Sequence, residues 1–330
     1  MAQRVIIAGG YGVVGAAVAR LLRDVSPTLE IVLAGRRPDE GAAIAAALGA
    51  QTRLLDVSVP AHLADLGPAD LVVAALYDPD DALLTAAEAS GAGYVGVTKL
   101  CDSLAPLMAR VARAAPTRPI APFGHWVSGV ATLAVREAVA DFARVDAVHA
   151  TALFDAADAL GPMSAGDAEH LMGRAYLRRG GQWEWLEAPA HVEEVTLFDG
   201  STAHAIPMAL LDGPTIVAFT GAAEMRFDIA QAVSRGAAQG RRASHDVHVV
   251  LKGVRGDGAA VTRRLLLSDP EGIGRMTALG VAAAAMRILG LDGDAPAPGG
   301  LYAPDSLMDA ARAMRWFREK GLIVETRDAP

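Results

Sequence analysis

The segment RVIIAGGYGVVGAAVARLL near the start of the chain constrains the fold more than any other stretch. Residues 4–8 form a short apolar run typical of a buried strand, and residues 13–24 show the apolar spacing of a helix. Between them, Gly10, Gly12 and Gly15 follow the pattern Gly-x-Gly-x-x-Gly. A loop of this kind between a strand and a helix is typical of dinucleotide-binding folds, although a glycine-rich turn can also hold no ligand.

Each glycine of this loop has a separate expected role. Gly10 would permit a tight turn, Gly12 would let the backbone approach a pyrophosphate, and Gly15 would let the helix pack closely on the strand. The N-terminus of the helix would add N–H donors and the positive end of its dipole. We therefore expect phosphate contacts from the whole loop, namely Gly10, Tyr11, Gly12, Val13, Val14 and Gly15.

The alternation of strand and helix patterns continues through the first 125 residues. Further strand-like runs lie at 30–34, 51–55, 70–76, 94–98 and 119–123. Helical patterns lie between them at 38–48, 60–66, 80–90 and 103–114. Strands that alternate with helices indicate a parallel sheet with crossover helices, and six strands complete a doubly wound unit. We predict an α/β protein that begins with a Rossmann doubly wound parallel sheet.

The pattern changes after Phe123. A helix is expected at 128–141 with Ser128 as its N-cap, and a second helix at 272–290. Strand-like runs are found at 145–154, 193–198, 214–219, and at 245–252 paired with 259–267 across the turn RGDG. Residues 292–300 read as a linker and 306–321 as a closing helix ended by Gly321. The second half is therefore predicted to be an α+β domain with a largely antiparallel or mixed sheet.

Charge and cysteine content narrow the class of protein. The net charge of −8 over 330 residues argues against nucleic acid or an anionic membrane as the main partner. The single cysteine, Cys101, excludes an intrachain disulfide, as expected for a reducing compartment. No run approaches the roughly 20 apolar residues of a membrane helix. We expect a soluble, cytoplasmic protein that acts on a small molecule.

The segment VLAGRRPDE, residues 32–40, bears on the choice of nucleotide. An acidic residue about 20 positions beyond the loop usually binds the ribose hydroxyls, and that position is Gly35 here, followed by Arg36 and Arg37. Gly35 removes the repulsion of a 2′-phosphate and leaves space, and the two guanidinium groups can hold the phosphate through forked, charge-assisted hydrogen bonds. This pattern favours NADP(H) over NAD(H), unless the arginines only occupy an exposed turn.

Asp56, after the third strand, is a second candidate near the nucleotide. It is expected either to contact the adenine side or only to end that strand.

Candidates for chemistry stand at the carboxyl ends of later strands, where ligands bind in open α/β sheets. Ala75 and Leu76 would lie along the cofactor, with Tyr77 beside the nicotinamide. Lys99 follows the fifth strand and His125 the sixth, and either could donate a proton while hydride reaches carbon. The plainer alternatives are that Tyr77 packs and that Lys99 is a solvated loop lysine.

Several other sites are excluded or weak. None of the tyrosines is followed four residues later by lysine, which excludes the Tyr-x-x-x-Lys pair of short-chain dehydrogenases. His245 and His248 would point to opposite faces of a strand and have no cysteine or acid cluster nearby, so no metal site is predicted. GGQWEWLE, residues 180–187, is expected to form an aromatic hairpin. Few cations of the second half could bind a dicarboxylate; the possible ones are Arg174, Arg178 and Arg226.

These stretches together resemble the saccharopine dehydrogenase-like family. The resemblance rests on IIAGGYGVVGAAVARLL, VLAGRRPDE, GAGYVGVTK, APFGHWVSGVATLAV and, near the end, PGGLYAPDSLMDAARAMRWFREKGL. The chain departs from the family pattern at Gly96, where an aspartate is common, and at GHWVSG, where a Pro-Gly turn is usual. The resemblance implies a Rossmann domain over 1–125 completed by 298–330, and a substrate and dimerisation domain over 126–297. It also implies hydride transfer at a C–N bond in many members, and a homodimer.

The sequence-based hypothesis is an NADPH-dependent oxidoreductase that transfers hydride to or from a C=N or C=O carbon of a small molecule. A non-catalytic NADP(H)-binding sensor or assembly protein would need the same loop and arginines. A carbonyl or enoyl reductase would keep the cofactor and change the reducible bond. A proton donor near the nicotinamide distinguishes the enzymes from the sensor.

Overall fold

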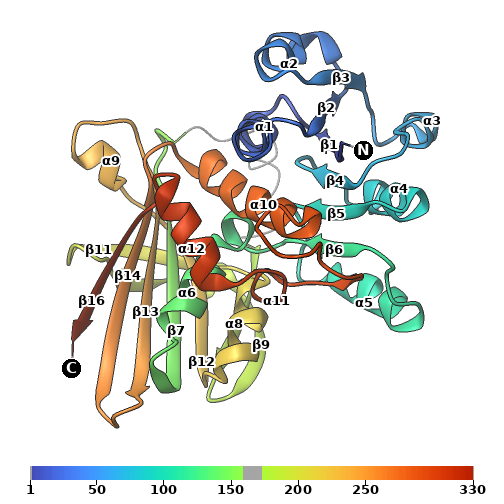
Figure 1. The fold of residues 1–330 in the computed structure, drawn as a ribbon. Helices are drawn as coiled ribbons and strands as arrows, with labels where there is room; N and C mark the ends of the chain where they lie inside the picture. The colour runs from blue at the N-terminus through green and yellow to red at the C-terminus, as the bar shows by residue number, and fades with distance from the viewer. Residues whose placement is uncertain (1, 159–172, 330) are drawn as a thin grey trace. The chain divides into compact units, whose positions relative to one another are not determined.

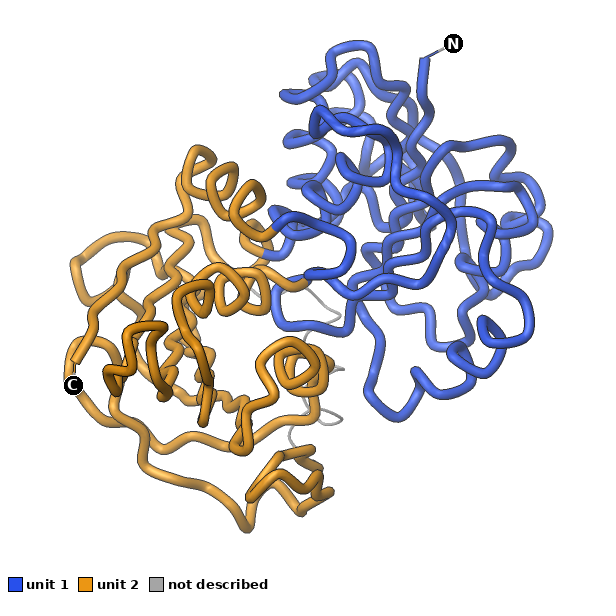
Figure 2. Tube along the Cα trace, turned by 60° about the horizontal axis from the view of Figure 1, so that its bottom comes forward, with its two compact units in different colours: residues 1–128, 277–309 blue, residues 129–276, 310–330 orange. Residues whose placement is uncertain are grey.

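The structure is a computed structural model that describes residues 2–158 and 173–329. The chain divides into two compact units, which are coloured separately in Figure 2. Unit 1 contains Met1–Ser128 and Thr277–Asp309, and unit 2 contains Gly129–Met276 and Ala310–Pro330. Helix α10, Ile273–Leu289, begins in unit 2 and continues in unit 1. No helix in the described parts of the chain is both long and apolar enough to cross a membrane.

Unit 1 is built on a seven-stranded parallel sheet in the order β15-β6-β5-β4-β1-β2-β3. Its strands are β1 Arg4–Ala8, β2 Glu30–Gly35, β3 Gln51–Leu54, β4 Leu71–Ala74, β5 Gly93–Gly96, β6 Pro119–Pro122 and β15 Gly300–Leu301. The crossover segments are α1 Val13–Val25, η1 Pro38–Gly41 with α2 Ala42–Leu48, α3 Pro60–Ala64, α4 Ala82–Ser90 and α5 Leu104–Arg113. The strand order reverses between β1 and β4, as in a doubly wound fold. The predicted Rossmann sheet is therefore confirmed, with β15 as an added edge strand.

Burial on both faces explains why the inner strands β1, β2, β4 and β5 of unit 1 are mostly apolar, whereas the edge strand β3 is polar and partly exposed. Val5, Ile6 and Ile7 on the central β1 have no exposed surface, because helices cover the sheet on each side. Helix α1 contributes an apolar stripe that contains Val18 and Leu22, both fully buried. The core therefore holds the sheet rigidly and brings the carboxyl ends of its strands to one edge.

Unit 2 contains a mixed nine-stranded sheet with the main order β10-β11-β12-β7-β13-β14-β16, and β8 and β9 branch from β12. Its strands are β7 Phe142–Phe154, β8 Arg174–Arg179, β9 Gln182–Glu187, β10 Glu193–Thr196, β11 Thr202–Pro207, β12 Glu224–Gln231, β13 His245–Arg255, β14 Ala260–Asp269 and β16 Ile323–Ala329. The other elements are α6 Val130–Ala138, η3 Ala188–His191, α8 Asp212–Thr220, α9 Arg235–Ala238, α11 Pro304–Leu307 in unit 1, and α12 Ala310–Glu319. Among the described strands of this sheet, β12 and β7 pair in parallel and the other pairs are antiparallel, so the predicted, largely antiparallel or mixed sheet is confirmed. The expected hairpin at 245–267 corresponds to β13–β14. The aromatic hairpin expected within 180–187 is larger than predicted, because those residues form only its turn and second strand β9, and its first strand is β8 at 174–179.

Two local predictions were wrong. The apolar run 214–219 is not a strand but lies within helix α8, where Pro214 occupies the first turn and Asp212 accepts a hydrogen bond from Thr132 Oγ1 at 2.6 Å. A short apolar run cannot by itself distinguish a strand from a buried helix, and a proline suits a first helical turn. Ser128 does not cap α6: the N-cap is Gly129, with φ 87°.

The closing segment divides between the two units, which differs from the expected return of 298–330 to the first domain. Strand β15 and helix α11 join unit 1, whereas α12 and β16 belong to unit 2. Helix α12 packs beside α6 on one face of the unit 2 sheet, with Phe317 fully buried and Arg318 paired to Glu137 (Figure 1). β16 pairs antiparallel with β14. The amphipathic face of α12 thus finds its apolar partner in unit 2.

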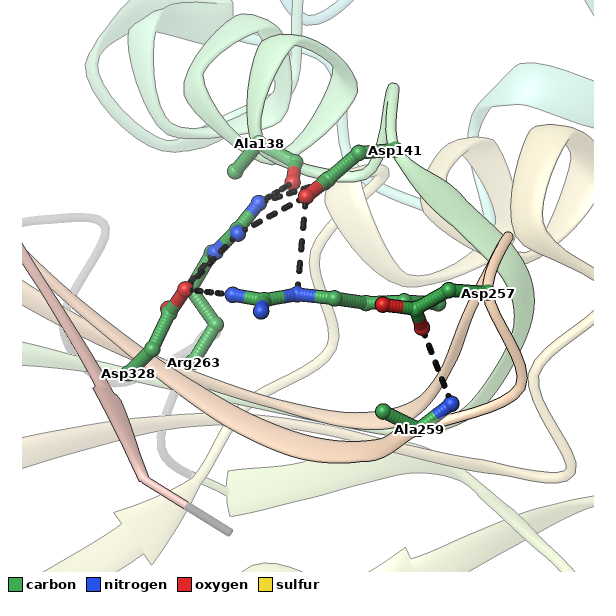
Figure 3. A network of polar contacts seen from close by, with 7 residues as sticks. Ala138, Asp141, Asp257, Ala259, Arg263 and Asp328 are labelled. Carbon is green, nitrogen blue, oxygen red and sulfur yellow. Dashed lines mark hydrogen bonds and ion pairs between the residues drawn. The ribbon is translucent and has the colours of Figure 1, made fainter.

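A guanidinium–carboxylate network fixes β16 to the rest of unit 2 (Figure 3). Arg263 on β14 donates to both oxygens of Asp141, at 2.6 and 3.0 Å, and to both oxygens of Asp328 on β16, each at 2.9 Å. Its Nη1 also donates to the carbonyl of Ala138, and Arg255 pairs with Asp328 from β13. Hydrogen bonds from Arg263 lower the pKa of both Asp141 and Asp328. The network therefore ties the end of α6 to three strands.

Replacing Arg263 with methionine is expected to destabilise unit 2 by about 1–3 kcal/mol, because several charge-assisted hydrogen bonds are lost at a mostly covered side chain. Amide hydrogen exchange in 323–329 should accelerate. Folding lowers the pKa of both Asp141 and Asp328, so the ion pairs stabilise the protein fully above the unfolded-state pKa of about 4 and lose this effect as the pH falls below it. The difference in unfolding free energy between wild type and Arg263→Met should therefore shrink in acid.

The matched control is Arg144→Met, which removes an exposed ion pair between Arg144 and Asp146, both on β7. It should change the free energy of unfolding by less than about 0.5 kcal/mol. Urea unfolding and hydrogen exchange on both variants provide the measurement. Equal effects of the two substitutions would show that the network does not secure β16.

Candidate functional site

The glycine loop lies where the sequence placed it, between β1 and α1 at the carboxyl edge of the parallel sheet. The N–H groups of Gly9 and Gly10 both donate to Ala34 O on β2, at 2.8 and 3.3 Å, and Gly12 N–H donates to Gly9 O at 3.0 Å. These bonds fold the loop tightly over the strand ends. The first turn of α1 then begins at Val13.

The glycines are required by close backbone contacts. A Cβ on Gly15 would lie 2.3 Å from Gly9 O, so only glycine lets α1 approach the loop at this point. A Cβ on Gly10 would lie 2.7 Å from both Ile7 O and Leu33 Cα. Of the four glycines in this loop, Gly9 has a positive φ, at 75°. The tight turn that the sequence assigned to Gly10 is therefore made by Gly9, whereas Gly10 is needed because a side chain there would clash with β1 and β2.

The start of α1 offers donors to a ligand. Its N-cap is Gly12, which has no side chain to satisfy the free N–H groups of the first turn and is itself exposed. A Cβ on Gly12 would meet only Gly9 O, at 3.2 Å, so the outer side of the loop is open. No acidic residue stands in the first turn. An anion approaching Gly12 therefore meets backbone donors and the positive end of the helix dipole.

The end of β2 presents the two arginines in different environments. Arg37 pairs with Glu40 at 2.7 Å, and its N–H donates to the phenolic oxygen of Tyr11 at 2.7 Å. Arg36 is exposed and forms no ion pair with any side chain in residues 2–158 or 173–329. The pKa of Asp56 is lowered, chiefly by hydrogen bonds from Ser58 and to a smaller extent by Arg36. Arg36 is thus the more available cation, with Asp56 in its neighbourhood.

The end of β4 runs beside the glycine loop. Ala75 N–H donates to Ala8 O at 2.9 Å, and a Cβ on Gly9 would lie 2.4 Å from Ala75 O. Leu76 follows and is partly buried, whereas half of the surface of Tyr77 is exposed. Ala75 and Leu76 are therefore next to the loop, as expected, and the Tyr77 ring is available to a ligand rather than packed in the core.

Lys99, after β5, is a buried lysine with a counter-ion. Its side chain is 6% exposed, and its Nζ donates to Asp81 Oδ2 at 2.6 Å. Asp81 is the N-cap of α4 but makes no capping hydrogen bond, and its backbone is left-handed, with φ 54°. Asp78 caps the helix instead, since its carboxylate accepts from the N–H groups of Ala82 and Leu83 at 2.9 and 2.8 Å. The carboxylate of Asp81 is thereby left to Lys99, so Lys99 is not a solvated loop lysine.

Tyr94 completes this polar cluster. Burial raises the pKa of its phenol, and the nearby Asp78 and Asp81 raise it further. A Cβ on Gly96 would lie 2.8 Å from the Tyr94 oxygen. The glycine that departs from the family pattern is therefore required by the tyrosine two residues earlier on the same face of β5.

His125, after β6, is almost completely buried, and its ring meets Phe123 edge-on at a centroid distance of 5.9 Å. Burial lowers the pKa of His125 to about 3. Its imidazole is therefore neutral at pH 7 and can donate or accept a hydrogen bond, but it is not an imidazolium acid in this state.

A strained turn follows His125. Val127 and Ser128 are left-handed, with φ 46° and 53°, a conformation that a β-branched residue rarely adopts. Gly280 on α10 accommodates it, because a Cβ there would lie 2.4 Å from Ser128 O. Strain of this kind concentrates at functional sites. The turn at Val127 and Ser128 follows the carboxyl end of β6, at the same edge of the sheet as the glycine loop.

Sequence reasoning missed four residues at this edge of the sheet: Gly9, Asp78, Asp81 and Tyr94. Gly9 escaped notice because the Gly-x-Gly-x-x-Gly pattern begins at Gly10, and the acidic run DPDD at 78–81 could have signalled carboxylates beside Lys99. No sequence signal identifies Asp81 as left-handed or Tyr94 as its neighbour. No group of three or more His, Cys, Asp or Glu side chains suited to a metal occurs within residues 2–158 and 173–329.

The buried histidine generates a prediction about acid stability. Because the pKa of His125 is about 3 when folded and near 6.5 when unfolded, the unfolded chain binds more protons between these values, so stability falls as pH drops. Between pH 7 and pH 5 this single group should cost wild type about 2 kcal/mol of unfolding free energy. Urea titrations of wild type and His125→Asn at both pH values measure it. The pH-dependent loss should be smaller in the variant by that amount; identical losses would contradict the assignment.

Comparison with known proteins bears on the fold. No protein-family model matches the chain, and no curated protein matches it in sequence. Among solved structures, apo saccharopine dehydrogenase (L-Glu forming) from Saccharomyces cerevisiae superposes with a TM-score of 0.70 at 12% identity, over 99% of this chain and 100% of that one. GenD2 from gentamicin A biosynthesis, in complex with NAD, gives 0.53 at 14% identity, over 98% of this chain and 96% of that one. The chain therefore has the saccharopine dehydrogenase-like fold that its sequence motifs predicted.

Proposed function

We propose that this chain is an NADP(H)-dependent oxidoreductase that transfers hydride to or from the carbon of a C=N or C=O bond in a small molecule. The observation that carries the proposal is the open start of α1 at Gly12, with the exposed guanidinium of Arg36, which has no ion-pair partner among the described residues, on the adjacent strand end. The fold likeness to saccharopine dehydrogenase and to NAD-bound GenD2 supports a nicotinamide nucleotide as the ligand. A sensor would share the loop but would not need a buried cation–carboxylate pair beside it.

The residues of the loop fit the pyrophosphate of a dinucleotide. Gly12 removes any side chain from the approach, and the N–H groups at the start of α1 face outward. Val13, of which 52% is exposed, and Val14 stand on the first turn beside them. These residues would hold the phosphates through backbone donors alone, which suits either nucleotide.

Selection of NADP(H) rests on Arg36. It is exposed, and the strand end contains no carboxylate at position 35, so a 2′-phosphate would meet a guanidinium and no repelling acid there. Arg37 contributes less, because Glu40 already neutralises it. Asp56 lies within electrostatic range of Arg36 and would stand on the adenine side.

The nicotinamide, when bound, supplies or accepts the hydride; the chain must hold the proton. Lys99 is the group suited to this, because its Nζ donates to Asp81 Oδ2 at 2.6 Å in a mostly buried position. Tyr77, at the exposed end of β4, would orient the substrate. His125 would act as a neutral hydrogen-bonding group rather than as a charged acid.

The arginines of unit 2 favour a substrate with less charge than a dicarboxylate. Arg226 is buried and is fully engaged by Asp228 at 2.7 and 2.8 Å, by Glu193 at 2.6 Å and by His191 O at 2.9 Å. Arg174 and Arg178 lie over the rings of Trp185 and Trp183. None of the three is an isolated cation awaiting a carboxylate.

The cofactor proposal predicts a preference for NADPH that one arginine controls. In calorimetric titrations, wild type should bind NADPH at least about tenfold more tightly than NADH, as loss of charge-assisted hydrogen bonds implies. Arg36→Ala should reduce the affinity for NADPH to that for NADH and leave NADH binding unchanged.

Arg37→Ala is the matched control, because it removes a neighbouring guanidinium that Glu40 already pairs, and it should keep most of the preference. Failure of wild type to bind either nucleotide would remove the proposed function altogether. Equal loss in both variants would mean that the arginines act only through net charge.

The catalytic proposal predicts separation of binding from turnover. Lys99→Met should keep NADPH affinity within about threefold and lower kcat about a hundredfold or more, as expected for loss of a proton donor. The measurement is oxidation of NADPH with a panel of cyclic imines, ketones and aldehydes that first identifies a substrate for wild type. A Lys99→Met enzyme with full kcat would exclude Lys99 as the donor.

A further inference from the structure

The side chain of Tyr11 occupies the space above the end of β2. A Cβ on Gly35 would lie 2.4 Å from its phenolic oxygen and 2.7 Å from its Cζ, and a Cβ on Gly41 would lie 2.7 Å from its Cδ1. All three distances are shorter than real contacts of a Cβ atom. Two glycines six positions apart therefore make room for one aromatic ring.

Neither glycine needs its freedom of backbone conformation. Gly35 and Gly41 are absent from the glycines with positive φ, and Gly41 has φ −86° and ψ −9°. Any L-residue could adopt these angles. What excludes a side chain at both positions is the Tyr11 ring, so the constraint is steric.

The phenolic oxygen of Tyr11 also fixes the turn that carries the arginines. It accepts the N–H of Arg37 at 2.7 Å, one residue beyond Arg36. The ring thus contacts the start and the end of 35–41, and its hydroxyl holds the middle. Arg37 is further held by Glu40, so the exposed guanidinium of Arg36 is the free cation on a turn that is anchored at three points.

We propose that Tyr11 determines cofactor specificity: by filling the position that a ribose-binding carboxylate would need, and by anchoring the 35–41 turn, it makes this site selective for a nucleotide with a 2′-phosphate. The inference rests on the proposed function, since it concerns the same nucleotide site. It assigns to Tyr11 a role beyond that of a loop residue near the phosphates. It also replaces the expected reason for Gly35, which is not empty space for phosphate but space for the tyrosine.

This arrangement has a consequence for changing the specificity. Gly35→Asp alone places its Cβ 2.4 Å from the Tyr11 hydroxyl, so either the ring or the turn must move, and we expect the carboxylate to be kept from the ribose. With Tyr11→Ala in the same chain, the position is open. The aspartate can then accept hydrogen bonds from both ribose hydroxyls and repel a 2′-phosphate.

The test uses the adenosine end of the cofactor alone. Adenosine 2′,5′-bisphosphate and AMP are titrated calorimetrically into wild type, Tyr11→Phe, Gly35→Asp and the double variant Tyr11→Ala with Gly35→Asp. Tyr11→Phe keeps the ring and loses one hydrogen bond, so it should weaken the bisphosphate about fivefold and AMP by less than about twofold. The double variant should bind AMP about tenfold more tightly than the bisphosphate, whereas Gly35→Asp alone should bind both poorly.

Tyr302→Phe is the matched control, because it removes a phenolic hydrogen bond to Pro298 O elsewhere in unit 1 and should change neither affinity. Circular dichroism and thermal unfolding confirm that each variant is folded. If Gly35→Asp does not fold, the comparison of Tyr11→Phe with wild type still shows whether Tyr11 contributes to the preference for the bisphosphate.

The outcomes separate this inference from the proposed function. If wild type prefers the bisphosphate, either of two results overturns the role of Tyr11 and leaves the NADP(H) site standing: Tyr11→Phe retains the full preference, or Gly35→Asp inverts the preference without any change at Tyr11. If wild type does not bind the bisphosphate at all, the proposed function fails first.

Discussion

The rest of the site depends on a backbone contact among glycines at the edge of the unit 1 sheet. Gly15 on α1 lies so close to Gly9 that a Cβ would stand 2.3 Å from its carbonyl oxygen, and Gly9 in turn lies against Ala75 O. This contact brings the N-terminus of α1 down onto the ends of β1 and β4. The free N–H groups of the helix then lie at the strand ends, where Tyr77, Lys99 and the arginines also stand.

A second constraint lies at the end of β2, where we propose that the choice of nucleotide is made. The loop glycines would suit any dinucleotide, whereas Tyr11 links the loop to the end of β2, one residue beyond the exposed Arg36. The same principle operates at β5, where Tyr94 requires Gly96 and lies near the Lys99–Asp81 pair. In both places an aromatic ring occupies the space that a Cβ on a glycine would need, and charged side chains lie nearby.

Much of unit 1 could be predicted because its signals are local. The apolar runs that became β1, β2, β4, β5 and β6 are buried, and each is bounded by a helix pattern; the edge strand β3 is not buried. In unit 2 the pairings connect distant segments: β12 pairs with β7, and β16 returns to β14. Residues 214–219 were predicted as a strand and lie in helix α8, because a short apolar run is compatible with either a strand or a buried helix. The left-handed Asp81 and the position of the Tyr11 ring depend on tertiary contacts that no pattern in the sequence encodes.

The measurement that tests the account most directly is a crystal structure of this chain grown with NADP⁺. The account predicts the pyrophosphate over Gly12 and the start of α1, the 2′-phosphate against the guanidinium of Arg36, and the Tyr11 ring still seated on Gly35. A nucleotide whose ribose end lies away from Arg36, or a Tyr11 ring displaced from Gly35 by the bound nucleotide, would contradict it.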